Sequence, residues 1–241
     1  MNAAAELDEL FPPELGARLR PHVRVIRRRR GETILGSGTL STEVYFLLSG
    51  RAQAVLLSEG GREVILGTVF QGALVGELAA IDTRPRSVSI IALTDCALAT
   101  IPGRDFREAL AEVPGAGLWI AERLARQVRS LTDRVFELHV LPVRTRLHCE
   151  LLRLCVAAGC AGGTCTIDPA PNQPQLAAQI GSHREAVSRE MSYLAGEGIL
   201  EQRPVLRILE LRALAAMVRA VAGELEIVLL AESLLGGAPA D

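Results

Sequence analysis

The chain has 241 residues, more than one typical domain and about the length of two small ones. Its formal net charge is −2 at pH 7, so any contact with nucleic acid must come from a local basic surface. All 26 basic residues are arginine, which excludes lysine Schiff-base chemistry and a lysine-dependent phosphate loop. The acidic start lacks the layout of a signal peptide, and no uncharged apolar run reaches membrane-spanning length, so we expect a cytoplasmic protein without membrane contact.

A short helix is expected at about residues 6–19, and β-rich segments punctuated by glycine follow over residues 23–102. The strand-like segments are residues 44–48, 52–57, 63–66 and 88–93, with turn signals at residues 49–50 and 59–61. Many short strands with glycine corners predict a barrel or jelly roll. For the arginine run at residues 27–30 we favour the solvated start of the first strand over a polyanion patch.

The segment from Gly76 to Val88 suits the capture of a cyclic sugar-phosphate inside a β-barrel. Gly76 lets backbone approach a ligand closely, and the amides that follow present N–H groups to an anion if they open a short helix. Glu77 is placed to accept a hydrogen bond from a ribose hydroxyl. Ten residues after the glycine, Arg86 offers a planar guanidinium for a phosphodiester, and Ser87 adds a hydroxyl beside it. The alternative is a surface turn with an incidental arginine.

Beyond Gly117 the apolar spacing becomes helical. Apolar residues recur at alternating steps of three and four, the pattern of a two-stranded coiled coil: Ala121, Leu124, Val128, Leu131, Val135 and Leu138. An ordinary helix packed on one core is the alternative, but the narrow stripe favours a dimer seam. Pro142 suits the first turn of a new helix and disfavours helical angles at Leu141, so we expect a hinge between them.

A helix-turn-helix is predicted in the third region. Residues 172–175 look like a capped helix start, residues 176–180 make a short amphipathic helix, and Gly181 is the turn residue. Ser182 and Glu185 have the spacing of a capping box that opens a second helix, and capping is an equal alternative to DNA contact for Glu185. Such a helix end suits the major groove, where arginine reads guanine and glutamate accepts from cytosine. The residues expected to face DNA are Asn172, Gln173, Ser182, His183, Arg184, Glu185, Ser188 and Arg189.

Two segments follow this helix. Residues 196–200 and 203–208 look like the turn and β-wing of a winged helix. The tail from about residue 219 to Asp241 is rich in leucine and valine, so we expect an extra helix that covers core surface, with partner binding as the second interpretation.

Four of the five cysteines cluster, with Cys96 apart: Cys149, Cys155, Cys160 and Cys165. No C-x-x-C pair occurs, which disfavours a zinc or iron–sulfur site. Residues 150–157 have the pattern of an amphipathic helix in which a cysteine is a small apolar filler. We therefore expect free buried thiols and no metal, with redox sensing as the alternative.

In this order the three regions resemble the cyclic-AMP receptor protein (CRP/FNR) family of bacterial transcription regulators, over roughly residues 10–218. The resemblance is carried by Gly-Glu-Leu-Ala at residues 76–79 with Pro-Arg-Ser at 85–87, and by Arg-Glu followed by a further arginine at 184–189. It implies an α+β chain with three parts. These are a β-roll or jelly-roll cyclic-nucleotide-binding domain over residues 1–115, a dimerisation helix over 116–141, and a winged helix-turn-helix DNA-binding domain with a helical extension over 142–241.

The resemblance also implies a homodimer that binds a cyclic nucleotide, repositions its winged helices and recruits RNA polymerase at an inverted-repeat operator with TGTGA-like half-sites. Members that respond to cyclic AMP read the adenine amine with two adjacent hydroxyl residues. The matching positions here are Leu131 and Thr132, so half of that pair is absent and both cyclic AMP and cyclic GMP stay open. The implied nucleotide site is Gly76, Glu77, Leu78, Arg86, Ser87, Leu131 and Thr132. The alternative is a regulator of the same fold that answers to redox state, a gas or no ligand.

Other classes of protein fit less well. A nucleotide-binding module without DNA function would lack the Gly181 turn and the basic helix after it. An enzyme would need a catalytic constellation, but the four histidines have no metal-ligand spacing, and neither a nucleophile elbow nor a dinucleotide fingerprint occurs. We therefore expect no catalytic residues. A haem sensor is disfavoured because the predicted barrel contains no histidine after His22.

Overall fold

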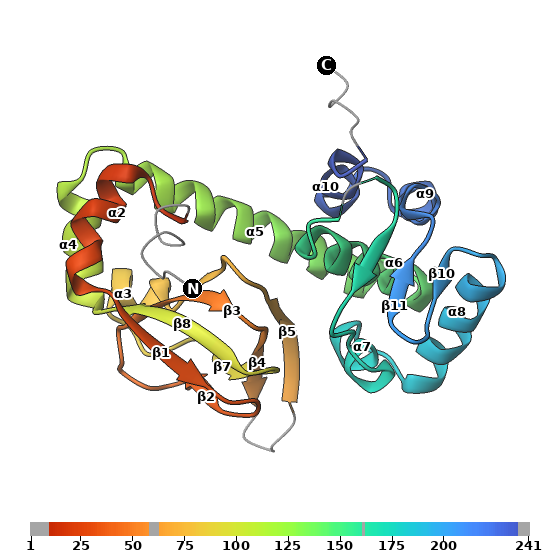
Figure 1. Cartoon of the computed structure of the whole chain (residues 1–241), viewed down its shortest axis with the longest axis horizontal. Coiled ribbons are helices and arrows are strands. Elements are labelled where there is room, and N and C mark those ends of the chain that lie inside the picture. The colour runs from red at the N-terminus through yellow and green to blue at the C-terminus, as the bar shows by residue number, and fades with distance from the viewer. Residues whose placement is uncertain (1–9, 58–62, 161, 236–241) are drawn as a thin grey trace. The chain divides into compact units, whose positions relative to one another are not determined.

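The computed structural model describes residues 10–57, 63–160 and 162–235. The chain divides into two compact units, Met1–Ala125 and Arg126–Asp241. Strands build most of the first unit and helices most of the second (Figure 1). The predicted α+β class is confirmed, with its N-terminal β-roll, long helix and C-terminal winged helix-turn-helix.

Two antiparallel four-stranded sheets form the β-roll of the first unit. One sheet has the order β1 (Arg24–Arg28), β8 (Cys96–Ile101), β3 (Val44–Ser49) and β6 (Leu74–Val75). The other has the order β2 (Thr33–Leu35), β7 (Ser89–Ala92), β4 (Ala52–Leu57) and β5 (Glu63–Val69). All four predicted strands are present, whereas the turn expected at residues 59–61 lies outside the described residues.

The arginine run is solvated, as expected, but its position in the strand was predicted wrongly. Arg27 and Arg28 end β1, and Arg29 and Arg30 lead into the following turn. The apolar residues ahead of them pair with β8, so the strand starts at Arg24 and the run closes it.

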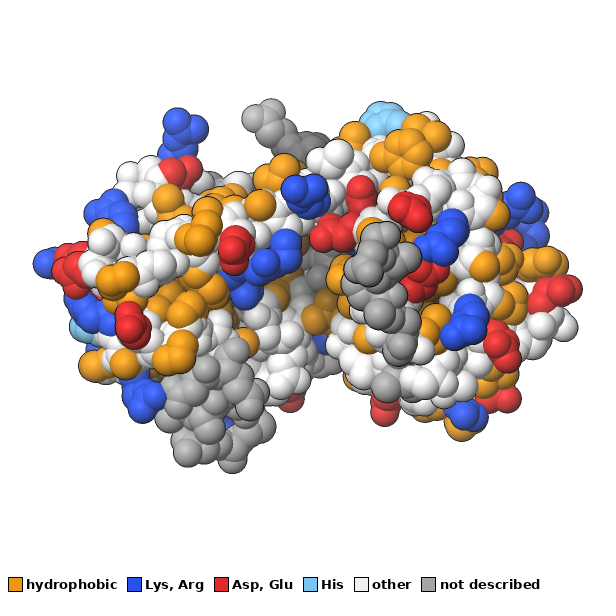
Figure 2. Space-filling view, turned by 90° about the horizontal axis from the view of Figure 1, so that it is seen from above, with side chains coloured by type: hydrophobic (Ala, Val, Ile, Leu, Met, Phe, Trp, Pro, Cys, Tyr) orange, Lys and Arg blue, Asp and Glu red, His pale blue; other side chains and the backbone are white. Residues whose placement is uncertain are grey.

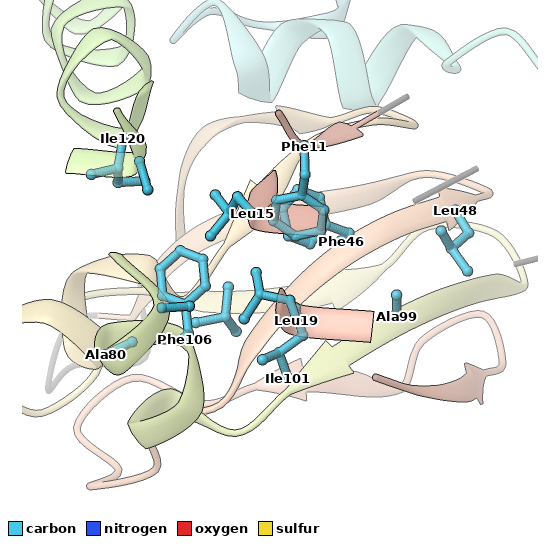
Figure 3. Packing of buried hydrophobic residues seen from close by; sticks show 13 residues of the cluster. Phe11, Leu15, Leu19, Phe46, Leu48, Ala80, Ala99, Ile101, Phe106 and Ile120 are labelled. Atoms are coloured by element: carbon cyan, nitrogen blue, oxygen red, sulfur yellow. The ribbon is translucent and has the colours of Figure 1, made fainter. Parts of the chain in front are cut away.

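Helices close one side of the roll and supply much of its core. They are α2 (Pro13–Leu19), the 3-10 turn η1 (Arg20–His22), α3 (Glu77–Asp82) and α4 (Gly103–Glu112). Phe11 packs edge to face on Phe46 of β3, with ring centroids 4.4 Å apart, and Leu15, Leu19 and Phe106 surround the pair (Figure 3). Of the entry helix predicted over about residues 6–19, the structure describes Leu10 and α2 as helical, whereas residues 6–9 lie outside the described residues.

The helix α5 (Ala116–Val140) contains the boundary between the two units, and its second half begins the second unit. The helix α6 (Val143–Ala157) follows after a bend, with Pro142 as its N-cap. The helix-turn-helix consists of α7 (Gln173–Gln179) and α8 (Arg184–Gly196). A small antiparallel sheet of β10 (Leu200–Glu201), β11 (Leu206–Ile208) and β9 (Cys165–Ile167) forms the wing.

The tail folds as two helices, α9 (Leu211–Ala222) and α10 (Glu226–Ser233). Both contact α6 (Figure 1), and Val228 and Ala231 of α10 are fully buried. The expectation that the tail adds a helix over core surface agrees with this arrangement, although residues 236–241 lie outside the described residues.

Two local expectations were wrong. Ser182 and Glu185 do not form a capping box: α8 has His183 as its N-cap and no side-chain cap, because the Ser182 amide instead bonds the Ala177 carbonyl within the turn. The expectation of free thiols fails at Cys160 and Cys165, which form a disulfide because β9 returns to the end of α6 and brings their Cα atoms to 5.2 Å. Three cysteines stay free and buried, as expected: Cys96, Cys149 and Cys155.

Candidate functional site

The predicted phosphate cassette contains Gly76, at a position that has no room for a side chain. Gly76 is the N-cap of α3 with φ +87°, in the left-handed region. A Cβ at this position would lie 2.5 Å from Nη1 of Arg86 and 2.8 Å from the Glu43 carbonyl oxygen. The glycine therefore permits both the turn into α3 and the close approach of the arginine.

Arg86 is almost fully buried, and its guanidinium is held from three sides. Nε donates to Oγ of Ser41 at 3.1 Å, Nη1 to the Gly76 carbonyl at 2.7 Å, and Nη2 to the Glu43 carbonyl at 2.6 Å. A guanidinium has five N–H groups, and these bonds to described residues use one on each of its three nitrogens, which leaves a second N–H on each terminal nitrogen. These bonds fix the orientation in which the charge is presented to an anion.

Burial of the charged Arg86 guanidinium is energetically unfavourable, because it removes the charge from water. Burial lowers the pKa of its guanidinium, and the nearby Tyr45, Glu43 and Glu77 oppose that shift. The Glu43 carboxylate lies 3.8 Å from Nη2, and its side chain is 48% exposed. A buried guanidinium with one partly solvated counter-ion is a favourable place for a further negative charge.

Glu77 lies at the start of α3 and is 5% exposed. Burial raises the pKa of its carboxyl, while a bond to its own backbone and the charges of Arg123 and Arg86 lower it. Arg123 of α5 also donates to the Gly72 carbonyl at 3.4 Å and lies over the Trp119 ring. The carboxyl is thus shielded from water yet close to two guanidinium groups.

The structure brings Gly76, Glu77 and Arg86 together, and places Leu78 and Ser87 on the exposed rim of the same segment. Sequence reasoning missed Ser41, Glu43 and Arg123. Arg123 lies outside the apolar stripe that the sequence predicts for this helix, and no local pattern marks the other two as partners of Arg86. Leu131 and Thr132 belong to the second unit, where Thr132 bonds the Val128 carbonyl of its own helix. Their contact with a nucleotide stays a prediction.

The candidate DNA-binding surface is the exposed end of α8. His183, Arg184, Glu185 and Arg189 are exposed, and Ser182 and Ser188 are half-buried. Val187, Met191 and Leu194 are buried on the opposite face, so the helix turns its charged side outward. Gly181 has φ +59°, which gives the tight turn that places α8 against α7.

Asn172 and Gln173 have other roles besides the predicted one. Asn172 caps α7 and forms a reciprocal capping box with Gln175, each side chain bonding the other's amide at 2.9 Å. Gln173 is half-buried at the first position of the helix. Neither observation tests their predicted contact with DNA.

Two contacts hold α8 in place from behind. His148, buried on α6, lies with Nε2 2.7 Å from the Glu190 carboxylate. Gln202 of the wing donates to the Met191 carbonyl at 3.2 Å. Burial lowers the pKa of His148, against the opposing effect of Glu190.

The described residues contain no cluster of three or more histidine, cysteine or acidic side chains suited to a metal ion. Burial raises the pKa of Cys96, and it raises the pKa of Cys149 and Cys155 to about 12. These thiols stay protonated at neutral pH, whereas the thiolate is the reactive form.

In the described part of the chain, no helix is both long and apolar enough to cross a membrane. Basic and acidic side chains are both scattered over the face shown in Figure 2.

Two family models match the chain: the cyclic nucleotide-binding domain over residues 25–113 and the Crp-like helix-turn-helix domain over residues 145–217. The cyclic AMP receptor protein of Thermus thermophilus is 30% identical over 175 residues, which are 73% of this chain and 78% of that protein. The chain belongs to the CRP/FNR family of transcription regulators.

Similarity to other proteins agrees with CRP/FNR membership. A CRP-like cAMP-activated global transcriptional regulator of Mycobacterium tuberculosis is 25% identical over 197 residues, covering 81% of this chain and 88% of that protein. The solved structure of the c-di-GMP responsive global regulator CLP of Xanthomonas campestris has a TM-score of 0.63 at 22% identity, covers 81% of this chain and 98% of that one, and shows the fold alone. Lysophospholipase nte1 of Neosartorya fischeri is 32% identical over 104 residues, but these are only 7% of that protein. CRP/FNR proteins are regulators rather than enzymes.

Proposed function

We propose that this CRP/FNR protein is a homodimeric, sequence-specific DNA-binding transcription regulator whose DNA affinity is controlled by a cyclic nucleotide, cyclic AMP or cyclic GMP. The observation that carries the proposal is Arg86: a guanidinium buried beside the left-handed Gly76, held by three protein oxygens, with a donor left on each terminal nitrogen. A cyclic phosphodiester supplies one negative charge and two oxygens, which matches this arrangement. In the proposed site Glu77 accepts from the ribose, and Leu78 and Ser87 line the rim.

The proposal leaves open which purine base the bound nucleotide has. Leu131 supplies no hydroxyl for an adenine amine and Thr132 supplies one, so the sequence supports neither purine over the other. The names of two relatives specify cyclic AMP, and that of a structural neighbour specifies cyclic di-GMP. A cyclic dinucleotide therefore belongs among the ligands to be tested, although cyclic AMP and cyclic GMP are the proposed ones.

The test is a calorimetric titration of the wild-type protein with the three nucleotides in parallel, repeated for Arg86→Leu and Arg84→Leu. Arg84 is exposed two residues earlier, so its loss removes a similar charge from the surface alone. We expect Arg86→Leu to weaken nucleotide binding more than about 100-fold, since charge-assisted hydrogen bonds contribute about 1.5–3 kcal/mol each. Arg84→Leu should bind like the wild type.

Unchanged affinity in Arg86→Leu would refute the pocket. That variant also removes the Arg86 hydrogen bonds to the Gly76 and Glu43 carbonyls, so its fold must be checked by circular dichroism. If it does not fold, Arg86→Lys keeps the charge but cannot form the fork of hydrogen bonds, and it should still bind at least tenfold more weakly. Failure of the wild type to bind any of the three would favour the alternative, a regulator of the same fold that answers to another signal.

The partners follow from two exposed surfaces. The stripe Val128, Leu131, Val135 and Leu138 is 46–62% exposed in the single chain, and in the proposed dimer it packs against the same stripe of a second copy. The exposed end of α8 is proposed to enter the major groove, with Arg184 on a guanine and Glu185 on a cytosine. Recruitment of RNA polymerase and a cytoplasmic location complete the proposal.

A further inference from the structure

The bend between α5 and α6 was expected to be a hinge, yet buried ion pairs bridge it. Glu137 of α5 pairs with Arg153 of α6, and Arg134 of α5 pairs with Glu150 of α6 at 3.1 Å. Arg153 also reaches Glu150 at 3.3 Å, so the four groups form one connected network with two positive and two negative charges. The Glu137 and Glu150 side chains are 5% and 1% exposed.

Such a network resists opening. Burial lowers the pKa of Arg153, but the Glu150 and Glu137 charges outweigh that effect and raise it above its ordinary value. Separating a buried pair leaves at least one carboxylate buried without its counter-ion, which is far more costly than breaking an exposed pair. A rotation at Leu141 and Pro142 would pull these groups apart.

The C-terminal tail adds a second connection across the same bend. The N-terminus of α10 leaves its first amides without helical partners, and the carboxylate of Asp133 on α5 accepts from the Glu226 amide at 3.1 Å. The body of α10 contacts α6, and Val228 and Ala231 of α10 have no exposed surface. An ion pair between Arg219 and Glu232 joins α9 to α10. The tail therefore contacts both helices that meet at the bend.

We propose that α10 and the buried network fasten residues 133–140 of α5 to the DNA-binding unit, so that this part of α5, α6 and α8 move as one body. Bending of the chain during regulation then occurs in α5 ahead of Asp133, not at Leu141 and Pro142. The His148–Glu190 contact extends the body to the helix proposed to enter DNA. Thr132, proposed to contact the ligand, immediately precedes the fastened segment.

Hydrogen exchange of the full-length protein, followed by mass spectrometry, tests the fastening without any ligand. In Asp133→Ala we expect amides of both α10 and residues 134–140 to exchange about tenfold faster, a loss typical of a missing helix cap. Asp133→Asn keeps an acceptor oxygen and should retain most of the protection. Glu224→Ala is the matched control, since Glu224 is an exposed acidic residue two positions ahead of the same helix, and its side chain forms no hydrogen bond or ion pair with the described residues.

The proposal is overturned if Asp133→Ala exchanges like Glu224→Ala, or if only α10 responds while residues 134–140 keep their protection. If Asp133→Ala does not fold, full-length Asp133→Ser replaces the carboxylate with a shorter hydroxyl and should expose the same segment of α5. A fully protected segment in that variant would equally exclude a fastening role.

A second measurement concerns regulation and rests on the proposed function. In Asp133→Ala the ratio of operator affinities with and without cyclic nucleotide should fall at least threefold, while the nucleotide affinity of the DNA-free protein stays unchanged. The reason is that a loosened segment weakens the coupling between the nucleotide site and the DNA-binding helix. An unchanged ratio in a protein that does respond to nucleotide would contradict the link to regulation. If the wild type binds no nucleotide, the proposed function fails, and the exchange result still decides the fastening.

Discussion

At the scale of single residues, the candidate pocket depends on how Gly76 and Arg86 fit together. Gly76 leaves room where a side chain would stand, and Arg86 fills it with a guanidinium that bonds the glycine's own carbonyl. Without Arg86, the Glu43 carbonyl would lose its hydrogen bond to the guanidinium, and the Gly76 carbonyl would keep the bond from the Ala80 amide at 3.4 Å. Arg86 therefore has a structural role of its own. The anion is proposed to bind only the N–H groups of Arg86 that form no hydrogen bond within the protein.

The first consequence concerns Gly76→Ala. An alanine at positive φ costs about 1–2 kcal/mol, and the overlap with Arg86 and the Glu43 carbonyl adds about 1–3 kcal/mol. Gly115→Ala is the matched control, because Gly115 has a similar φ of +80° but no atom within 4 Å of the added Cβ. Urea unfolding should show a clearly larger loss of stability for Gly76→Ala, together with weaker nucleotide binding. Equal losses in the two variants would mean that the Arg86 contact is not tight.

At the scale of elements, α5 has two different halves. Its first half buries Ala116 and Ile120 in the core of the β-roll. Its second half exposes valine and leucine along one stripe and buries Glu137 on another face. A contiguous exposed apolar stripe on a helix is typical of an interaction surface. The charged network on the other face attaches the helix to its own chain, and the stripe stays exposed in the single chain, as the proposed dimer requires.

Val128→Asp tests the seam. A charge at this position would be buried against its symmetry mate in the dimer but solvated in the monomer, so we expect dissociation at micromolar concentration. Ser130→Asp, on an exposed position outside the stripe, should leave the dimer intact. Sedimentation velocity distinguishes the two. A wild-type protein that sediments as a monomer, or a dimeric Val128→Asp, would contradict the seam.

At the scale of the whole molecule, α5 contains the boundary between a unit that has the candidate nucleotide pocket and a unit that has the winged helix. Regulation then needs only a ligand that binds the DNA-competent arrangement more tightly than the resting one. What matters for regulation is where α5 bends. The fastening proposed above locates that part ahead of Asp133.

A dimer with two α8 helices should bind an inverted repeat whose half-sites are about 34–36 Å apart, roughly one turn of DNA, with TGTGA-like sequence. Arg184→Ala should cost about 1–3 kcal/mol at one base pair and relax preference there, while loss of a phosphate contact weakens all sequences alike. In vitro selection of binding sites, with and without cyclic nucleotide, measures both effects. Equal binding in the two conditions would show that the ligand does not switch this dimer.

The sequence by itself determined the family, the order of the parts and the position of the two main motifs. This was possible because each motif is defined by residues that are close together in the sequence. Examples are the spacing from Gly76 to Arg86, the three-and-four period of α5, and the Asn172 cap of α7. The strands were located for the same reason, since alternation and glycine turns are short-range signals.

Only the tertiary structure decided what surrounds these motifs. Ser41 and Glu43 lie 45 and 43 residues from Arg86 in sequence, and the Asp133 contact with Glu226 spans 93 residues. Two further outcomes depend on groups only five residues apart: the Ser182 amide bonds the Ala177 carbonyl in place of the predicted cap, and Cys160 forms a disulfide with Cys165. A buried charge is stable only with partners, and folding chooses those partners from distant parts of the chain, where no local pattern records them.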